Sequence, residues 1–342
     1  MRNEKLLEAL TQIWGVSGYE TEVRKYIKEE VRSYADEMWT DAVGNLIVLK
    51  KGTGGENSRK IMYSAHMDQI GFMVKTIEDN GLLRLANMGW NWAGSAYNER
   101  VIFRNGTVGV VGCYGPIEEA KNKIENLFVD IGSSSKEETE KLVKLGDCCT
   151  YEGKYVHLAT GKLCSVALDD RLGCYQLIEA LKENPGTYPN DCYYCFVVQE
   201  ELGCRGSQVA AQQILPDIGI AVDITPAHDY PNDLTGSNKI GHGIGIKICD
   251  PSVVSDEMVV RVMEELCEKK QIPNQREVID RGGTDASSMN VTGAGVRTGG
   301  ICVVTRYPHS QSSVVDGADI EAGIDLMNAF SAWDFGPKGE EE

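Results

Sequence analysis

Residues Cys195-Phe-Val-Val-Gln-Glu-Glu-Leu-Gly203 join an apolar run to an acidic pair, and this stretch decides the fold. The apolar run is typical of a buried strand, so Glu200 and Glu201 are expected at the end of a core strand. Each carboxylate costs several kcal/mol near an apolar core unless a partner offsets its charge. Because neighbouring side chains of a strand point to opposite sides, we expect one acid to bind a metal and the other to move a proton.

Candidate metal ligands lie at the ends of other predicted elements. The predicted strands that end in them are 60–65 before His66, 217–222 before Asp223 and 300–304 before His309. Asp169 stands where a predicted helix begins. Taken singly, each residue has an ordinary explanation; an Asp that opens a helix, for example, is usually an N-cap. Because the sites of open α/β sheets lie beyond the carboxyl ends of the strands, the coincidence favours one shared site.

This set of imidazole and carboxylate side chains suits two zinc-like ions. Two ions about 3.5–4 Å apart need a bridging carboxylate and a bridging water between them. Asp169, Glu200, Glu201 and Asp223 would together offset the four positive charges of two divalent ions. Zinc is the expected metal, and cobalt and manganese remain open because such ligands accept them too.

The composition is that of a soluble globular protein, with 342 residues of which 42% are hydrophobic and 25% charged. A formal net charge of −17 argues against nucleic acid and against anionic membranes as partners. No apolar run approaches the ~20 residues that cross a bilayer, and residues 1–10 lack the apolar centre of a signal peptide. We therefore expect a cytoplasmic protein that has no membrane partner.

Eleven cysteines are scattered along the chain, and several interrupt apolar runs. In a protein without an export signal they are expected to be reduced core thiols. Cys192 and Cys195 have the spacing of half a zinc site, but the chain holds no second such pair to complete it. The cysteines therefore indicate neither a cysteine zinc site nor a disulfide framework, and their role stays open.

Two domains are expected, because 342 residues exceed what one compact core usually holds. Predicted strands alternate with helices in 1–69 and again in 164–342, which predicts one discontinuous α/β catalytic domain. Residues 70–163 instead hold short strands and tight turns, among them Asn105-Gly106, a strong hairpin signal. This block is predicted to be a β-rich domain inserted into the first one.

Three local features are also predicted. Ser17-Gly-Tyr-Glu20 has the pattern of a capping box that opens a helix. Residues 134–145 are expected to be helical, and the tail 336–342 is expected to be disordered.

The motifs together resemble the dinuclear metallo-aminopeptidases of the tetrahedral (TET) type, which include glutamyl aminopeptidases and proteins labelled cellulase M. The motifs that carry this resemblance are His66-Met-Asp68-Gln-Ile-Gly71, Leu168-Asp-Asp-Arg-Leu-Gly173, Gln199-Glu-Glu-Leu-Gly203, Val222-Asp223, Gly282-Gly-Thr-Asp-Ala286 and Arg306-Tyr-Pro-His-Ser310. Their order and spacing match the family over nearly the whole chain, and the set is specific although no single motif is. One departure is Gln69, where such proteins often carry Glu.

The resemblance implies a fold and an assembly. The fold would be a mixed-sheet, co-catalytic peptidase domain of the phosphorylase/hydrolase-like type, interrupted by a small β-barrel-like domain used in self-association. Dimers would assemble into a hollow dodecamer, which admits only peptides able to enter.

The resemblance also implies a role for each site residue. In the metal shell, Asp169 would bridge two ions, His66 and Asp223 would hold one, and Glu201 and His309 would hold the other. Glu200 would be the general base, and Asp68 would orient the imidazole of His66. In related enzymes the Asp169–Asp170 peptide bond is cis.

The expected activity is removal of N-terminal residues from peptides by a metal-bridging hydroxide. Glu200 would take the proton of the water and return it to the leaving amine. The turn with Gly283, Thr284 and Asp285 and the glycine-rich segment 235–248 are the expected walls of the substrate pocket. The preferred first residue, the native metal and the oligomer size are left open by the sequence.

Two other classes of function compete with this hypothesis. An endoglucanase-like glycosidase needs two carboxyl groups facing each other across a sugar at about 5–9.5 Å, which adjacent glutamates do not readily provide. A non-catalytic scaffold would be expected to lack a ligand, and none of the five is missing. Within hydrolases, a relative that removes an acyl group or cleaves dipeptides could use the same two metals.

Overall fold

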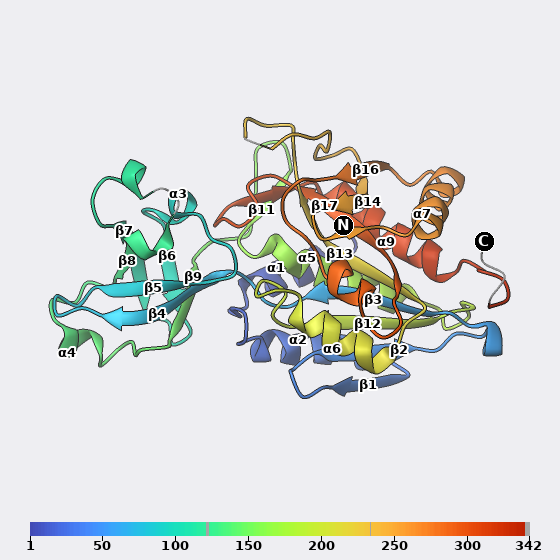
Figure 1. Ribbon diagram of the computed structural model, residues 1–342, viewed down its shortest axis with the longest axis horizontal. Helices are drawn as coiled ribbons and strands as arrows, with labels where there is room; N and C mark the ends of the chain where they lie inside the picture. Colours follow the sequence, from blue (N-terminus) through green and yellow to red (C-terminus); the bar gives the residue numbers. More distant parts are fainter. Residues whose placement is uncertain (121–122, 233, 339–342) are drawn as a thin grey trace.

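The chain folds into an α/β body built on one mixed sheet, with a β-barrel beside it (Figure 1). This computed structural model describes residues 1–120, 123–232 and 234–338. In the described chain the sheet has the order β1-β2-β12-β3-β13-β17-β14-β15, and β16 pairs with β14. Its strands are β1 (Glu37–Thr40), β2 (Leu46–Lys50), β3 (Lys60–His66), β12 (Asp191–Val197), β13 (Ile218–Pro226), β14 (Ile244–Asp250), β15 (Val253–Val254), β16 (Asn274–Val278) and β17 (Arg297–Thr305). The predicted mixed-sheet α/β architecture is confirmed.

The centre of the sheet is parallel, and its strands deliver the candidate ligands to one edge. Strands β12, β3, β13 and β17 run in the same direction, and Val197 of β12 lies opposite His66 at the end of β3. Asp223 lies within β13 and pairs with Cys302 of β17. The prediction that Asp223 follows its strand was therefore wrong, because the ladder with β17 continues as far as Pro226.

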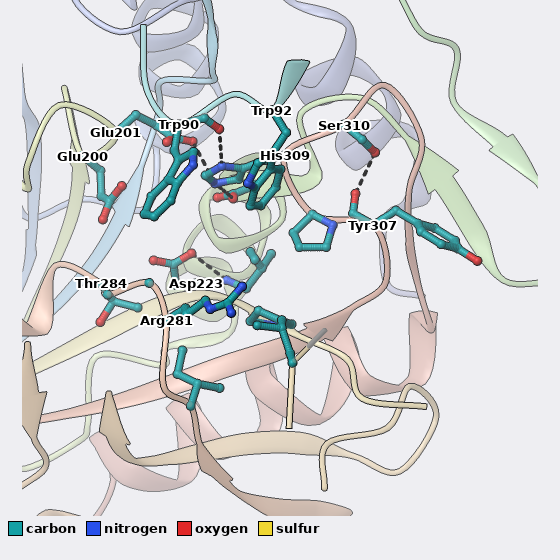
Figure 2. Close-up of a pocket in the computed structure, with 18 of the residues that line it drawn as sticks. Trp90, Trp92, Glu200, Glu201, Asp223, Arg281, Thr284, Tyr307, His309 and Ser310 are labelled. Carbon is teal, nitrogen blue, oxygen red and sulfur yellow. Dashed lines mark hydrogen bonds and ion pairs between the residues drawn. The ribbon is translucent and has the colours of Figure 1, made fainter. Parts of the chain in front are cut away.

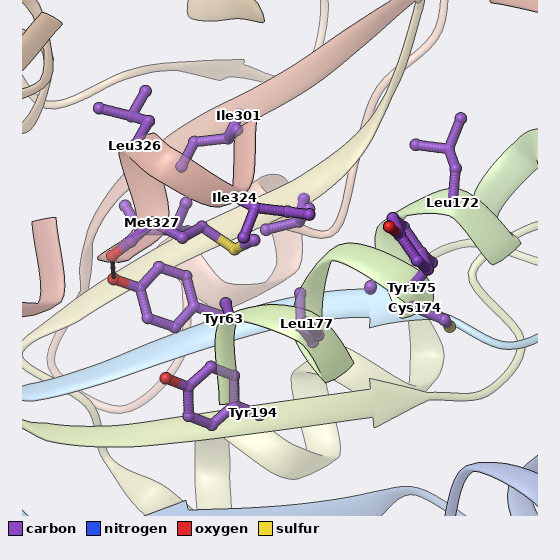
Figure 3. Close-up of a cluster of buried hydrophobic side chains, with 14 of the residues drawn as sticks. Tyr63, Leu172, Cys174, Tyr175, Leu177, Tyr194, Ile301, Ile324, Leu326 and Met327 are labelled. Carbon is purple, nitrogen blue, oxygen red and sulfur yellow. Dashed lines mark hydrogen bonds between the residues drawn. The ribbon is translucent and has the colours of Figure 1, made fainter. Parts of the chain in front are cut away.

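Helices cover both faces of the sheet. One face packs against α1 (Glu4–Gln12), α2 (Thr21–Val31), α5 (Leu168–Glu183), α7 (Glu257–Lys270) and α9 (Gly317–Ser331), and the other against α6 (Arg205–Ile214) and α8 (Ala286–Asn290). Helix α5 contacts the sheet as well as α1 and α9, which buries it all round from Leu168 to Leu181. Figure 3 shows part of this core, with side chains of α5 beside Tyr63 and Tyr194 of the sheet and Met327 of α9.

The core contains many of the cysteines as free thiols. Those that are fully buried include Cys174, Cys192, Cys195 and Cys302. Among the described residues every cysteine is free, and seven of the eleven are buried as predicted. The prediction of a core position was wrong for the four that are only partly buried: Cys113, Cys164, Cys204 and Cys249. Each buried cysteine side chain contributes as a small apolar group, since its burial removes nonpolar surface from water.

The barrel closes in the order β4-β5-β8-β7-β6-β9 around its own apolar core (Figure 1). Its strands are β4 (Gly71–Ile77), β5 (Leu83–Met88), β6 (Arg100–Phe103), β7 (Val108–Cys113), β8 (Leu127–Asp130) and β9 (Cys148–Tyr151), and α3 (Ala93–Ala96) lies between β5 and β6. The hairpin predicted at Asn105-Gly106 joins β6 to β7. The predicted helix 134–145 was wrong: α4 spans only Lys136–Thr139. The following segment leaves Leu142 and Leu145 exposed, so it has no apolar stripe to bury.

The two crossings between barrel and α/β body lie next to each other. Gln69 bridges Val16 on the way into the barrel, and its side chain donates to Thr150 Oγ1 on β9 at 2.8 Å and accepts from Arg171 Nη2 of α5 at 3.2 Å. A small sheet of β10 (Val156–His157), β11 (Leu163–Ser165) and β18 (Ser313–Val315) follows the barrel. The barrel is thereby tied to the edge of the sheet at which β3 ends.

The described end of the chain is fixed rather than disordered. The carbonyl oxygens of Gly336 and Pro337 accept hydrogen bonds from Arg59 at 3.3 and 3.1 Å, and Lys338 pairs with Asp217 at 3.0 Å. The prediction of a disordered tail was wrong for these residues, and 339–342 lie outside the described residues. In the part of the chain that the structure describes, no helix is both long and apolar enough to cross a membrane.

Candidate functional site

A pocket of about 870 Å³ opens at the carboxyl edge of the central strands, beside the barrel. The five predicted metal ligands and the predicted base line it: His66, Asp169, Glu201, Asp223 and His309, with Glu200. Figure 2 shows Glu201, Glu200 and Asp223 turned into the same space as the His309 ring. The sequence places these groups far apart, and the parallel sheet brings them together as the strand-end argument predicts.

Asp169 lies between the two histidines. One of its carboxylate oxygens, Oδ1, is 3.0 Å from His66 Nε2, and the other, Oδ2, is 3.0 Å from His309 Nε2. This carboxylate comes from the start of α5, where the Asp169–Asp170 peptide bond is cis, as the family resemblance implies. A carboxylate that offers one oxygen to each side is suited to bridge two cations.

Each histidine also faces a second carboxylate. His66 Nε2 is 4.0 Å from Asp223 Oδ1, and His309 Nε2 is 3.5 Å from Glu201 Oε1. Two groups of side chains here have ligand atoms that all lie within 4.8 Å of one another. One group is His66, Asp170 and Asp223, and the other is His66, Asp169 and Glu201. Asp170 was not predicted as a site residue; its Oδ2 accepts the backbone N–H of His66 at 3.2 Å.

The electrostatics of this cluster favour bound cations. Burial and the neighbouring carboxylates raise the pKa values of Glu200 and Asp223, and burial raises the pKa of Glu201 to about 7. Burial would also raise the pKa of Asp169, but its hydrogen bonds with His309 and His66 lower it below its usual value. Glu201 Oε1 is buried and has no hydrogen-bond partner in the described chain. Divalent ions would satisfy that oxygen and offset the concentrated negative charge, so the residues fit a metal centre.

Asp68 connects the His66 imidazole to the backbone of the acidic pair. His66 Nδ1 lies 3.0 Å from the Asp68 carbonyl oxygen and 3.5 Å from its carboxylate Oδ1. The same carboxylate accepts the backbone N–H of Glu200 at 3.1 Å and that of Glu201 at 3.3 Å. One fully buried side chain thus fixes both an imidazole and a turn.

The acidic pair lies in a turn after β12 and not in a strand, which corrects the predicted reason for its divided orientation. Gln199 has a φ of +57°, and the Glu200 carbonyl accepts the N–H groups of Gly203 and Cys204, both at 2.8 Å. The two side chains therefore point apart because of this turn and the Asp68 hydrogen bonds, rather than by strand alternation.

The predicted capping box was also wrong, and its residues belong to the surroundings of the site. Ser17 Oγ donates to Asp68 Oδ2 at 2.5 Å, and Glu20 makes no side-chain capping hydrogen bond to α2. Glu20 Oε1 instead accepts from Gly18 N at 2.7 Å and Gln199 N at 3.2 Å. The local pattern gives no signal of these contacts, because their partners lie on other segments of the chain.

Two of the three predicted substrate-binding residues line the pocket. Gly283 and Thr284 belong to its wall, whereas Asp285 is buried behind it and accepts from Ser64 Oγ at 2.8 Å and Ser207 Oγ at 2.5 Å. The segment 235–248 was also expected to form a wall, but none of its residues is among the described residues that line the pocket. Tyr230, Asn232 and Leu234, just before this segment, form that part of the wall instead.

The barrel supplies a wall that the sequence analysis missed. The carbonyl of Trp90 accepts the Nδ1–H of His309 at 2.7 Å, and the Trp92 ring lies 5.8 Å from the His309 ring (Figure 2). A Cβ on Gly89 would lie 2.9 Å from the Glu201 carboxylate, so only glycine fits there without a shift. Gly89-Trp90-Asn91-Trp92 was the available signal, because two tryptophans in a turn are uncommon on a monomer's surface.

Comparison with known proteins places the chain among peptidases. The family described as M42 glutamyl aminopeptidase matches residues 44–326. The lysyl aminopeptidase of Pyrococcus furiosus is 33% identical over 339 residues, covering 95% of each chain. An aminopeptidase structure from Desulfurococcus kamchatkensis has a TM-score of 0.90 at 34% identity, covering 98% of this chain and 95% of that one. The TET1 peptidase of Pyrococcus horikoshii, with a TM-score of 0.85 at 31% identity over 96% and 98% of the two chains, can assemble into a tetrahedron or a large octahedral shell.

Proposed function

Because this chain belongs to the M42 glutamyl aminopeptidase family and is thus an aminopeptidase, we propose that it removes N-terminal residues from peptides at the cluster around Asp169. The observation that carries this proposal is the pair of 3.0 Å contacts from the two Asp169 oxygens to His66 and His309. Such a carboxylate between two imidazoles is the arrangement that a two-metal hydrolase needs.

Five residues would hold two divalent ions in this proposal. His66 and Asp223 would hold one ion, Glu201 and His309 would hold the other, and Asp169 would contact both. Bound ions would acidify a water and polarise the carbonyl of the scissile bond. Zinc is the proposed metal, with cobalt and manganese as alternatives, because the donor set consists of imidazole and carboxylate groups.

Glu200 is the proposed general base. Its Oε2 lies 3.9 Å from His66 Nε2, in the same pocket and outside the proposed ligand set. Burial and nearby carboxylates raise its pKa, which suits a group that accepts a proton from water and returns it to the leaving amine. Asp68 would act as a positioning residue, since it holds the backbone of Glu200 and the ring of His66.

The walls of the pocket favour an apolar first residue in the substrate. Beyond the metal cluster, the lining is mainly aromatic and aliphatic: Trp90, Trp92, Ile224, Pro226, Tyr230, Leu234, Ile279, Tyr307 and Pro308. Apart from the metal cluster, Arg281 is the one charged side chain among the described residues that line the pocket. Burying a leucine or phenylalanine side chain against such walls removes apolar surface from water, whereas a charged side chain would lose hydration.

The division into a catalytic domain of 1–69 and 164–342 and an assembly domain of 70–163 is also part of the proposal. Exposed apolar side chains on the barrel, namely Val108, Val110, Leu142 and Leu145, support its use in self-association. Dimers that build a dodecamer remain the proposed assembly, supported by the self-assembly of the TET1 relative.

A glycosidase and a non-catalytic scaffold are not favoured. A glycosidase of two carboxyl groups would leave the imidazoles of His66 and His309 without a role. A scaffold would not require the full set of buried carboxylates, each of which is costly to hold in an apolar setting.

The proposal is tested with Glu200→Gln and a panel of aminoacyl anilides, assayed with added zinc and with chelator. We expect wild-type activity to require metal and to be highest, by at least about tenfold, on leucyl or phenylalanyl anilides. Glu200→Gln should retain both ions and lose about 10²–10⁴-fold in kcat, because the proton acceptor is gone.

Glu201→Gln is the matched control for the neighbouring position, and it should lose bound metal as well as rate. Normal turnover by Glu200→Gln would contradict its assignment as the base. Full activity of metal-free wild type would contradict the metal centre. A preference for glutamyl anilides would contradict the apolar preference and indicate that Arg281 selects the first residue of the substrate.

A further inference from the structure

A second group of potential ligands lies beside the proposed metal centre. It consists of Glu200, Cys204 and Asp285, and one ligand atom of each lies within 4.8 Å of the others. Cys204 Sγ is 3.2 Å from Glu200 Oε1. The three side chains come from the turn after β12 and from the starts of α6 and α8, so a thiol and two carboxylates meet only in the folded chain.

We propose that Glu200, Cys204 and Asp285 form a third cation site that takes a thiophilic divalent ion such as Zn²⁺ or Cd²⁺ and blocks the enzyme when occupied. The blocking effect rests on the proposed role of Glu200 as the base. Binding of the ion itself does not depend on that role.

The spacing of the three groups suits one small ion. Ligand atoms about 2.0–2.3 Å from a tetrahedral zinc lie roughly 3.3–3.8 Å apart, so atoms already within 4.8 Å need only small side-chain movements. Asp285 accepts one hydroxyl at each oxygen, from Ser207 and from Ser64, and each carboxylate oxygen keeps a second lone pair. These serines hold Asp285 in place without using up its capacity to bind.

The surroundings of the site admit an ion and include an unpartnered hydroxyl group. Glu200 and Cys204 line the open pocket, so an ion can arrive from solvent. Thr284 Oγ1, in the same pocket wall, is buried without a hydrogen-bond partner in the described chain. In Figure 2, Glu200 and Thr284 lie on the same side of the pocket, opposite Tyr307 and Ser310.

The charge of the cluster explains why a cation would be held there. The Cys204 thiol donates to Glu200 Oε1 at 3.2 Å, so without an ion it holds its proton. An incoming divalent ion replaces that proton, which leaves to solvent, and balances two of the three negative charges. A thiolate with two carboxylates is a ligand set that zinc and cadmium accept.

Occupation would stop catalysis by engaging the Glu200 carboxylate. A carboxylate coordinated to an ion has less electron density available for the proton of a water. The five proposed ligands of the catalytic ions would remain in place, so inhibition at high metal would occur without loss of the activating metals.

Cadmium titration of the full-length, metal-loaded enzyme tests the site. We expect wild type to gain the ultraviolet charge-transfer band of a cadmium–thiolate bond, with the rate on the best anilide substrate falling in parallel. Cys204→Ser should lose the band, and the cadmium concentration for half-inhibition, relative to its own starting rate, should rise at least about tenfold. Asp285→Asn is a second variant, which should weaken both effects.

Cys164→Ser is the matched control, because Cys164 is also partly exposed but lies on β11 outside the pocket. It should keep the band and the inhibition. A wild type without the band, or a band that persists in Cys204→Ser, would overturn the site. A Cys204-dependent band without inhibition would overturn the blocking effect and count against Glu200 as the base, while full activity without metal would instead overturn the proposed function.

Discussion

Single residues around the ligands hold the site in shape. Asp68 is fully buried, and its carboxylate accepts three hydrogen bonds, from the Ser17 hydroxyl and from the backbone N–H groups of Glu200 and Glu201. The His66 ring nitrogen Nδ1 lies 3.5 Å from the same carboxylate and 3.0 Å from the Asp68 carbonyl oxygen. A buried carboxylate with this many donors stays ionised, and the pKa of Asp68 is lowered despite its burial. Its negative charge can therefore support a positively polarised imidazole.

Asp68→Asn should impair activity more than folding. An amide nitrogen would face one of the N–H groups now bound by the carboxylate, which would shift the turn that carries Glu200. We expect kcat/KM and metal affinity to fall about 10–100-fold. Steady-state kinetics with metal analysis checks this. Ser17→Ala, which removes one donor and leaves the carboxylate, should have a clearly smaller effect; equal effects would contradict the positioning role.

Glu20 makes folding stability depend on pH. Burial and the charge of Asp68 raise its pKa from 4.5 to about 7, so between these values the folded chain holds a proton that the unfolded chain has lost. Stability should therefore fall as pH rises through this window. In the Glu20→Gln variant the side chain cannot ionise and keeps an acceptor for the N–H groups of Gly18 and Gln199. Its free energy of unfolding at pH 8 should therefore exceed that of wild type by about 1–3 kcal/mol.

Urea unfolding at pH 5 and pH 8 measures this difference, which should shrink at the lower pH. Glu22→Gln, on the exposed side of the same helix, should show no such dependence. A Glu20→Gln variant less stable than wild type at pH 8 would mean that folding does not raise the pKa of Glu20.

At the scale of elements, the parallel strands could be read from the sequence and the connecting segments could not. The apolar runs before His66 and near Asp223 predict strands whose carboxyl ends share an edge, and this places the candidate ligands correctly near one another. The turn at Gln199 and the contacts of Ser17 and Glu20 depend on partners that are distant in sequence. The role of the β5–α3 loop was missed for the same reason, since its target, His309, lies more than 200 residues away.

Gly89→Ala tests whether that loop must approach the site closely. Gly89 has a φ of +77°, and an added Cβ would meet the Glu201 carboxylate at 2.9 Å. Gly115 has nearly the same backbone, with a φ of +85°, but nothing lies within 4 Å of its added Cβ. Both alanine variants should lose about 1–2 kcal/mol of stability from the strained backbone conformation. Gly89→Ala should lose more, because its Cβ would also lie 2.8 Å from Ile70 Cγ2.

Only Gly89→Ala should also lose activity, by at least about tenfold in kcat/KM, together with bound metal. Thermal unfolding and metal analysis of the two purified variants separate these effects. Equal activity in the two variants would show that the loop tolerates displacement from Glu201.

At the scale of the whole molecule, the barrel combines a wall of the pocket with an exposed apolar surface. The loop between β5 and α3 contacts His309 through the Trp90 carbonyl. On β7 of the same barrel, the side chains of Val108 and Val110 are 43% and 44% exposed. Exposed valines at alternate positions share one face of the strand, and such a face favours a partner surface. The net charge of −17 would otherwise keep copies apart, so apolar contacts are needed to hold an assembly together.

Val110→Lys should therefore reduce the proposed assembly to smaller species without unfolding the barrel. A buried lysine at an interface between copies costs several kcal/mol unless it is paired. Light scattering on the purified protein gives the mass. Val254→Lys is the matched control, because Val254 is 70% exposed on β15 of the other body. An unchanged mass for Val110→Lys would exclude this surface from the contact.

The hydrogen bond from His309 to the Trp90 carbonyl also has a consequence for biosynthesis. His309 comes late in the chain and Trp90 early, so the imidazole can be held in this orientation only after the barrel has folded and the last strands have docked beside it. A nascent or half-folded copy would therefore lack a finished site.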